Sequence, residues 1–136
     1  MKNEFPSHNP KCIEFIQQKS RRGCGIACFA MLVGLMYDDA KTYFNRVSDG
    51  MYPDDLLDAL DVAGIEVSEV KHLPRKQAAL VALQWNKSGL AGHYVVWDPS
   101  RRQFLDPLHG VVDRDDLMEF ANIEHIWATE VIILRR

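Results

Sequence analysis

GCGIACFAMLVGLM, residues 23–36, is the longest apolar stretch of the chain and predicts the helix on which the fold is built. Its apolar side chains recur at helical spacing: Ile26, Phe29, Ala30 and Val33. A membrane-spanning helix needs about 20 apolar residues, and this stretch has only 14. We therefore expect a buried helix over about 24–36 and no membrane as a partner.

Downstream of this stretch, the sequence predicts two more helices and then a run of strands. One helix is expected over 40–47 with Asp38 as its N-cap, and a clearer one has Pro53 in its first turn and ends at Gly64. The apolar period then becomes strand-like over 65–70, 79–85, 93–97, 103–105 and 125–134, interrupted by a short helix over 113–120. Helices followed by strands are typical of an α+β fold with N-terminal helices packed on an antiparallel β-sheet.

The composition is that of a globular protein. Hydrophobic residues make up 47% and charged residues 26% of the 136 residues, and the formal net charge is −3. A mildly acidic chain lacks the positive field that binds phosphate backbones, so nucleic acid is not an expected partner. The N-terminus has no secretory signal, which predicts a cytoplasmic location and reduced thiols. We expect one domain over 1–136, with residues 1–11 loose, and the oligomeric state stays open.

Cys24 stands at the predicted start of the first helix, between Gly23 and Gly25. A helix N-terminus beside an imidazolium favours the thiolate form of a cysteine, and flanking glycines let a substrate carbonyl approach. Cys24 is therefore a candidate nucleophile. A Cys-Gly pair is a weak signal on its own, and the alternative is that Cys24 is a small buried core residue.

His93 and Asp106 are the candidate general base and the acid that orients it. His93 begins a predicted strand, residues 98–101 (DPSR) form a turn, and the returning strand ends at Asp106. If the turn is centred just after Pro99, the numbers of paired residues add up to 199, and His93 lies opposite Asp106 with Cβ atoms about 5 Å apart. Asp98 would then point to the other face and initiate the turn. The alternative for the pair is a structural ion pair on a half-exposed sheet.

Acyl chemistry also needs hydrogen-bond donors aimed at the developing oxyanion. Gln18, six residues before Cys24, could supply a side-chain amide donor beside the Cys24 backbone N–H. Gln17 is an immediate rival, and a surface glutamine is the alternative for both. His109, close to Asp106, could border the same cleft, but we interpret it as a solvated loop residue.

Three ordered motifs resemble those of the bacteriocin-processing, double-glycine-leader peptidases. Residues 18–32, QKSRRGCGIACFAML, are similar to the opening motif of these enzymes, in which a glutamine precedes a Cys-Gly pair by six residues. Residues 92–96, GHYVV, and the later Asp106-Pro107 resemble their histidine strand and Asp-Pro motif. Residues 54–65 resemble their helix-turn-strand connector, so the similarity covers about residues 16–110.

This resemblance implies a papain-like cysteine peptidase. In that fold the nucleophile begins the long helix, the base and its partner lie on the sheet, and the cleft forms between them. Cys24 would attack the carbonyl, His93 would accept and return the proton, Asp106 would fix the ring, and Gln18 would help to hold the oxyanion. The expected reaction is hydrolysis of a peptide or isopeptide bond in a peptide or protein substrate, through an acyl-enzyme and without a metal or organic cofactor.

Two features depart from the family pattern. Gly23, behind Arg21 and Arg22, stands where an acidic residue is common in the family. The best-known members are domains of peptide-exporting transporters, whereas this sequence has no membrane segment and no phosphate-binding loop. We therefore expect a free-standing relative, for which the resemblance does not imply a double-glycine leader peptide as substrate.

Other functions use the same residues or the same scaffold. A glutamine deamidase or acyltransferase would need the same triad. A catalytically silent peptide-binding module would keep the scaffold, but it need not keep all four candidate residues. A zinc site built from Cys24 and Cys28 with His93 or Cys12 is disfavoured, because the chain has no paired Cys-x-x-Cys spacing.

Overall fold

The structure, a computed structural model, describes residues 13–20, 23–44, 53–70, 73–84, 91–121 and 125–133. Its helices are α1 (Cys24–Val33), α2 (Tyr37–Lys41), α3 (Pro53–Val62) and α4 (Arg114–Ala121). Its strands are β1 (Ile65–Val70), β2 (Ala79–Gln84), β3 (Ala91–Asp98), β4 (Gln103–Asp106), β5 (Gly110–Val112) and β6 (His125–Ile133). The segment expected to be loose, 1–11, lies outside the described residues.

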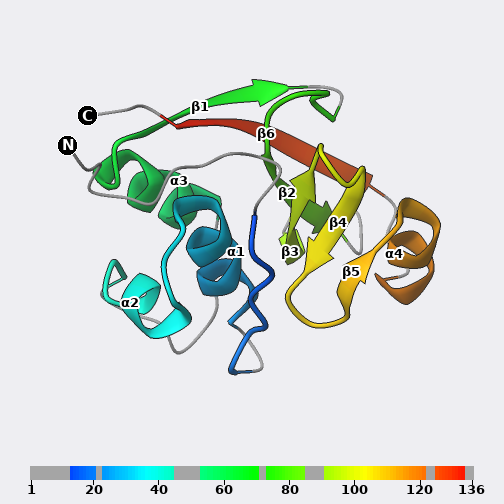
Figure 1. The fold of residues 1–136 in the computed structure, drawn as a ribbon, viewed down its shortest axis with the longest axis horizontal. Coiled ribbons are helices and arrows are strands. Elements are labelled where there is room, and N and C mark those ends of the chain that lie inside the picture. Colours follow the sequence, from blue (N-terminus) through cyan, green and yellow to red (C-terminus); the bar gives the residue numbers. More distant parts are fainter. Residues whose placement is uncertain are drawn as a thin grey trace.

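The strands form a six-stranded sheet in the order β1-β6-β2-β3-β4-β5, and every neighbouring pair is antiparallel. Helices α1, α2 and α3 gather on one side of this sheet, and α4 lies beside β5 at its far end (Figure 1). The predicted α+β architecture, with N-terminal helices packed on an antiparallel sheet, is confirmed. No helix within the described ranges is long and apolar enough to cross a bilayer.

Helix α1 is the centre of the larger core. Every residue of α1 after Cys24 is buried, and the helix packs with Leu56 and Leu60 of α3 and with Tyr94 and Val96 of β3. A helix that is apolar all round is stable only when it is surrounded in this way. Cys24 is consequently the one residue of α1 that reaches solvent, and the rest of the helix anchors it.

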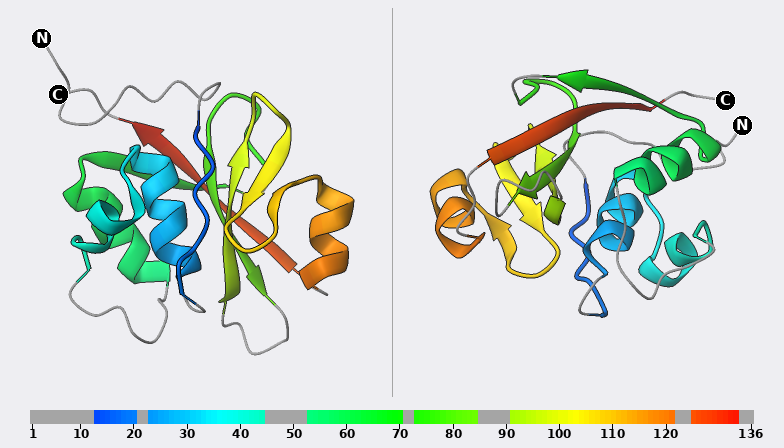
Figure 2. Two further views of the ribbon diagram at one scale, coloured as in Figure 1. Left: turned by 60° about the horizontal axis from the view of Figure 1, so that its bottom comes forward. Right: turned by 180° about the vertical axis from the view of Figure 1, so that it is seen from behind.

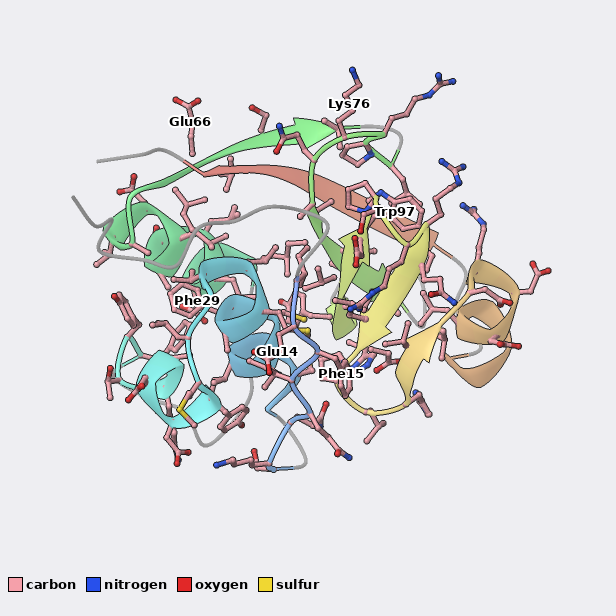
Figure 3. The ribbon with its side chains drawn as sticks, in the orientation of Figure 1. Glu14, Phe15, Phe29, Glu66, Lys76 and Trp97 are labelled. Carbon is pink, nitrogen blue, oxygen red and sulfur yellow. The ribbon has the colours of Figure 1, made fainter. Side chains whose placement is uncertain are left out.

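The other face of the sheet carries a second, smaller core beneath α4. Trp97 and Phe104 pack there with ring centroids 5.1 Å apart, together with Leu117 of α4. Val96, the neighbour of Trp97, belongs to the α1 core instead, because successive side chains of a strand point to opposite faces. Figure 3 shows this separation, with Phe29 among the helices and Trp97 on the sheet.

An extended segment over residues 13–20 runs between the helices and the sheet (Figure 2). Ile13 is buried in the α1 core, and Phe15 packs against that core in a partly buried position; Figure 3 shows Phe15 beside α1. Further along, the backbone N–H of Gln18 donates to the carbonyl oxygen of Pro107 at 3.1 Å. The segment that carries Gln18 is thereby tied both to the helices and to the loop after β4.

The end of α1 differs from the prediction. The helix stops at Val33, three residues before the expected end, because Gly34 adopts a left-handed conformation with φ of 85°. Its N–H donates to the carbonyl oxygen of Ala30 at 2.8 Å, which satisfies one of the last carbonyls of the helix. Glycine is the usual residue at this position because it has no Cβ to clash.

The position of α2 was also predicted wrongly. The helix begins at Tyr37 with Met36 as its N-cap, so Asp38 is not the cap. Asp38 and Asp39 lie in the first turn, where a carboxylate interacts favourably with the helix dipole. The Thr42 hydroxyl donates to the Asp39 carbonyl at 2.7 Å as the helix ends. The predicted helical residues 45–47 lie outside the described part of the chain.

Candidate active site

Cys24 is the first residue of α1, directly after the N-cap Gly23. The first N–H groups of an α-helix have no acceptor within the helix, and they carry its positive dipole end. Cys24 is partly exposed, whereas the nine other residues of the helix, including Cys28, are buried. Cys24 is thus not fully buried, although it packs against the α1 core.

His93 and Asp106 are hydrogen-bonded in the interior. His93 Nε2 lies 2.7 Å from Asp106 Oδ1, and the two residues are 7% and 1% exposed, respectively. His93 also pairs with Leu83 of β2 where the register between β2 and β3 shifts, and such irregularities re-aim the side chains beside them. The alternative placed this ion pair on a half-exposed face, whereas both partners are buried.

The register that brings the two residues together is not the predicted one. In the hairpin of β3 and β4, Val96 pairs with Leu105 and Trp97 with Phe104, so partner numbers add up to 201 instead of 199. Asp98 pairs with Gln103, so the loop between paired residues is two residues longer than expected, and Arg102 adopts a left-handed φ of 54° within it. A shift of two residues keeps every side chain on its face, whereas a shift of one would have separated His93 from Asp106.

Asp98 has the turn-forming role that the sequence predicts. Its Oδ1 accepts hydrogen bonds from the Ser100 backbone N–H at 3.0 Å and from the Ser100 hydroxyl at 2.9 Å. Its Oδ2 lies 3.4 Å from Arg101 Nε. These contacts stay within the turn, so Asp98 is not a competing partner for His93.

The electrostatics of the pair favour a charged imidazole. Burial alone would lower the pKa of His93, but the hydrogen bonds to Asp106 and Cys24 and the charges of both raise that pKa to about 9. Burial alone would raise the pKa of Asp106, but the hydrogen bond and charge of His93, with donors from His109 and Leu108, lower it to about 2. At neutral pH the pair is an imidazolium and a carboxylate.

Cys24 lies beside this pair and interacts with the His93 ring through its side chain. Because Nε2 of His93 is bound to Asp106, Nδ1 is the ring nitrogen left for the interaction with the Cys24 thiol. The His93 ring therefore lies between the Cys24 thiol and the Asp106 carboxylate. A nucleophile, a base and an orienting group would have this order in space.

Gln18 lies near the same site through its backbone bond to Pro107, the residue after Asp106. Its side-chain Nε2 donates to the carbonyl oxygen of Ser20 at 2.9 Å, and an amide carries two donor hydrogens. Gln17 is exposed. Of the two rivals, Gln18 is the one that the structure ties to the loop carrying Asp106.

His109 contacts the buried carboxylate of Asp106, which the sequence did not predict. Its ring Nδ1 lies 2.9 Å from Asp106 Oδ2, and its side chain is 35% exposed. It is therefore a direct partner of the buried carboxylate and not merely a solvated loop residue. The signal was its position three residues after Asp106, beyond Pro107, where a tight turn can bring a side chain back.

Tyr37 of α2 fills the space beside Gly23. A Cβ at position 23 would overlap the Tyr37 hydroxyl and would touch the hydroxyl of Ser20 at 3.0 Å. Lys19 lies over the Tyr37 ring, with Nζ 5.6 Å from the centroid, and pairs with Asp38 at 3.2 Å. A side chain at position 23 would therefore require the Tyr37 hydroxyl to move.

The other cysteines and the basic pair do not extend the site. Cys28 is fully buried, and burial, with the charges of Cys24 and Asp106, raises the pKa of its thiol well above the ordinary value. Among the described residues, no cluster of three or more His, Cys, Asp or Glu side chains could hold a metal ion. Cys12, Arg21 and Arg22 lie outside the described residues.

The comparisons with known proteins agree with the fold. No protein-family model and no curated protein matches the sequence. A solved structure, the crystal structure of a double glycine motif protease from an AMS/PCAT transporter in complex with the leader peptide, matches with a TM-score of 0.67. The match covers 91% of this chain and 94% of that one at 18% sequence identity. The chain therefore has the papain-like fold of that protease, as the motif resemblance implied.

Proposed function

We propose that the chain is a cysteine peptidase that hydrolyses a peptide or isopeptide bond, with Cys24, His93 and Asp106 as its catalytic triad. The observation that carries the proposal is the buried bond of 2.7 Å between His93 Nε2 and Asp106 Oδ1, beside a partly exposed cysteine at a helix N-terminus. The likeness to a protease that was crystallised with a leader peptide supports a peptide substrate.

The reaction follows from the charges of these groups. The Cys24 sulfur attacks the substrate carbonyl carbon, and the C–S bond forms as the carbonyl oxygen takes up the negative charge. The imidazolium of His93 gives its proton to the leaving amine, the C–N bond breaks, and an acyl-enzyme remains. His93 then takes a proton from water as the water oxygen attacks the acyl carbon; the C–S bond breaks, the carboxylic acid leaves, and the Cys24 thiolate and the His93 imidazolium are restored.

Asp106 acts through His93. Its ionised carboxylate accepts the Nε2–H, which leaves Nδ1 to exchange protons with the sulfur and the leaving group. Burial strengthens this interaction because little water competes for either partner. The Cys24 backbone N–H and the Gln18 side-chain amide are the proposed oxyanion donors, and the bond from Gln18 to the Ser20 carbonyl orients that amide.

Selective alkylation of Cys24 tests the proposal. An activated thiolate should react with iodoacetamide near pH 6 much faster than a free thiol, and His93→Ala should remove this advantage. Tandem mass spectrometry distinguishes Cys24 from Cys28, which is fully buried and serves as an internal control. Labelling of Cys24 at the rate of a free thiol in the folded wild-type protein would contradict the proposal.

Product analysis separates peptide cleavage from the related reactions. A peptide library treated with the wild-type protein should yield new N-termini, and the Cys24→Ala variant should yield none. Ammonia release from glutamine-containing peptides without chain cleavage would instead indicate deamidation by the same triad.

A further inference from the structure

We infer that His109 is a positioning residue for the triad, which fixes the Asp106 carboxylate by donating its Nδ1–H to Oδ2. The inference rests on the proposed function and adds a fourth side chain to the machinery. It is based on how the donors divide between the two oxygens of one buried carboxylate.

The two oxygens of Asp106 are held very differently. Oδ1 lies near three donors: His93 Nε2 at 2.7 Å, the Leu108 N–H at 2.9 Å and the His109 N–H at 3.3 Å. Among the described residues, the only donor to Oδ2 is His109 Nδ1 at 2.9 Å. The position of Oδ2, and with it the plane of the carboxylate, therefore depends on the His109 ring.

The carboxylate plane matters because its torsion is soft. Rotation about the terminal bond of an aspartate has broad minima, so donors have to fix it. A carboxylate held at Oδ1 alone can pivot about that atom, and the direction of the bond to His93 changes with it. Donors at both oxygens prevent this rotation, and Asp106 is only 1% exposed, so water has little access to replace a lost donor.

The protonation of the two rings follows from the same contacts. Asp106 is ionised at neutral pH, since the surrounding donors lower its pKa to about 2, and an ionised carboxylate only accepts hydrogen bonds. Both His93 Nε2 and His109 Nδ1 must then carry a proton. His109 performs this role in its neutral or its charged form, because Nδ1–H is present in the charged form and in one neutral tautomer.

Three variants separate a positioning role from a general effect on the loop. His109→Ala removes the donor. His109→Asn keeps an N–H donor at the place of Nδ1, because the amide nitrogen of asparagine is attached at the same distance from the backbone. Val111→Ala is the matched control, since Val111 lies two residues after His109 and is 41% exposed.

Two measurements are made on each variant. The first is the rate of Cys24 alkylation at pH 6. The second is the proton NMR signal of the His93 Nε2–H, which a short bond to a carboxylate shifts downfield and which His93→Ala identifies by its loss. Circular dichroism verifies that each variant is folded.

We expect His109→Ala to slow the alkylation roughly tenfold, the order of effect of one charge-assisted hydrogen bond, and to shift or broaden the His93 signal. His109→Asn should restore most of both, and Val111→Ala should change neither. The inference is overturned if His109→Ala leaves both readouts unchanged, if asparagine restores nothing, or if Val111→Ala has the same effect as His109→Ala. A wild-type Cys24 that is not activated would contradict the proposed function alone, because the NMR signal still tests the role of His109.

Discussion

Replacing Asp106 by asparagine should remove stability in a defined pH window. The substitution keeps the size of the side chain but exchanges one acceptor oxygen for an NH2 group. Either the His93 ring or the His109 ring then faces a donor instead of an acceptor, at contacts that measure 2.7 Å and 2.9 Å in the wild type. Loss of one partner from a buried ion pair costs about 3–5 kcal/mol. We expect about 3 kcal/mol, because the buried His93 can lose its proton when the carboxylate is gone.

The pH window follows from the two folded pKa values. The pKa of His93 is raised from 6.5 to about 9, so its stabilisation is complete below pH 6.5 and disappears as the pH rises through 9. The pKa of Asp106 is lowered from 3.8 to about 2, so its stabilisation is complete above pH 3.8 and disappears as the pH falls through 2. The difference between wild type and Asp106→Asn should therefore be largest between about pH 4 and 6.5.

Urea unfolding followed by circular dichroism at pH 5, 8 and 10 measures this difference. Asp98→Asn is the matched control, because Asp98 is also fully buried but is bound by Ser100 and Arg101 instead of an imidazole. Asp98→Asn should not show a loss of unfolding free energy that becomes smaller between pH 6.5 and 9. A difference for Asp106→Asn that stays constant from pH 5 to 10 would refute the charged pair.

Two further substitutions test the surroundings of Cys24. Gly23→Ala should lower the free energy of unfolding by about 1–3 kcal/mol and slow Cys24 alkylation, since the new Cβ overlaps the Tyr37 hydroxyl. Adding Tyr37→Phe removes that hydroxyl and should restore much of the stability and of the alkylation rate, because the new Cβ lies 3.3 Å from the ring Cζ. Gln18→Ala should lower kcat for peptide hydrolysis by about 10²–10³ and leave Cys24 alkylation, which forms no oxyanion, near the wild-type rate. Gln17→Ala should change neither, and a Gln18→Ala variant with full peptidase activity would exclude the oxyanion role.

The sequence predicted the elements that have strong local signals. Helix α3 begins at Pro53, as expected, and Gly64 follows its end with a φ of 83°. Strand β1 spans Ile65–Val70, as predicted, because the change from helical to alternating period is abrupt there. The fold class followed from the order of these elements. The short strand β5 was missed, since three residues are too few to establish a period.

The errors near the site have a common physical origin in turns. The hairpin after Asp98 contains a non-glycine residue, Arg102, with a left-handed φ, which no residue preference announces. The contact of His109 with Asp106 likewise depends on the path of a short loop. Turn geometry of this kind is decided by tertiary packing and by single hydrogen bonds, so the sequence alone could not give the register of the hairpin or the partners of its loop.

The pairing of His93 with Asp106 was nevertheless anticipated, and the reason lies in the period of a strand. Trp97 pairs with Phe104, and His93 and Asp106 each lie an even number of residues away from that pair. They consequently share a face whether partner numbers add up to 199 or to 201. The side chains then close the diagonal distance, as the bond of 2.7 Å requires. Two residues on neighbouring strands thus share a face whenever the register shifts by an even number of residues. The spacing of His93 and Asp106 around the turn is enough to predict the shared face, although it does not predict the register itself.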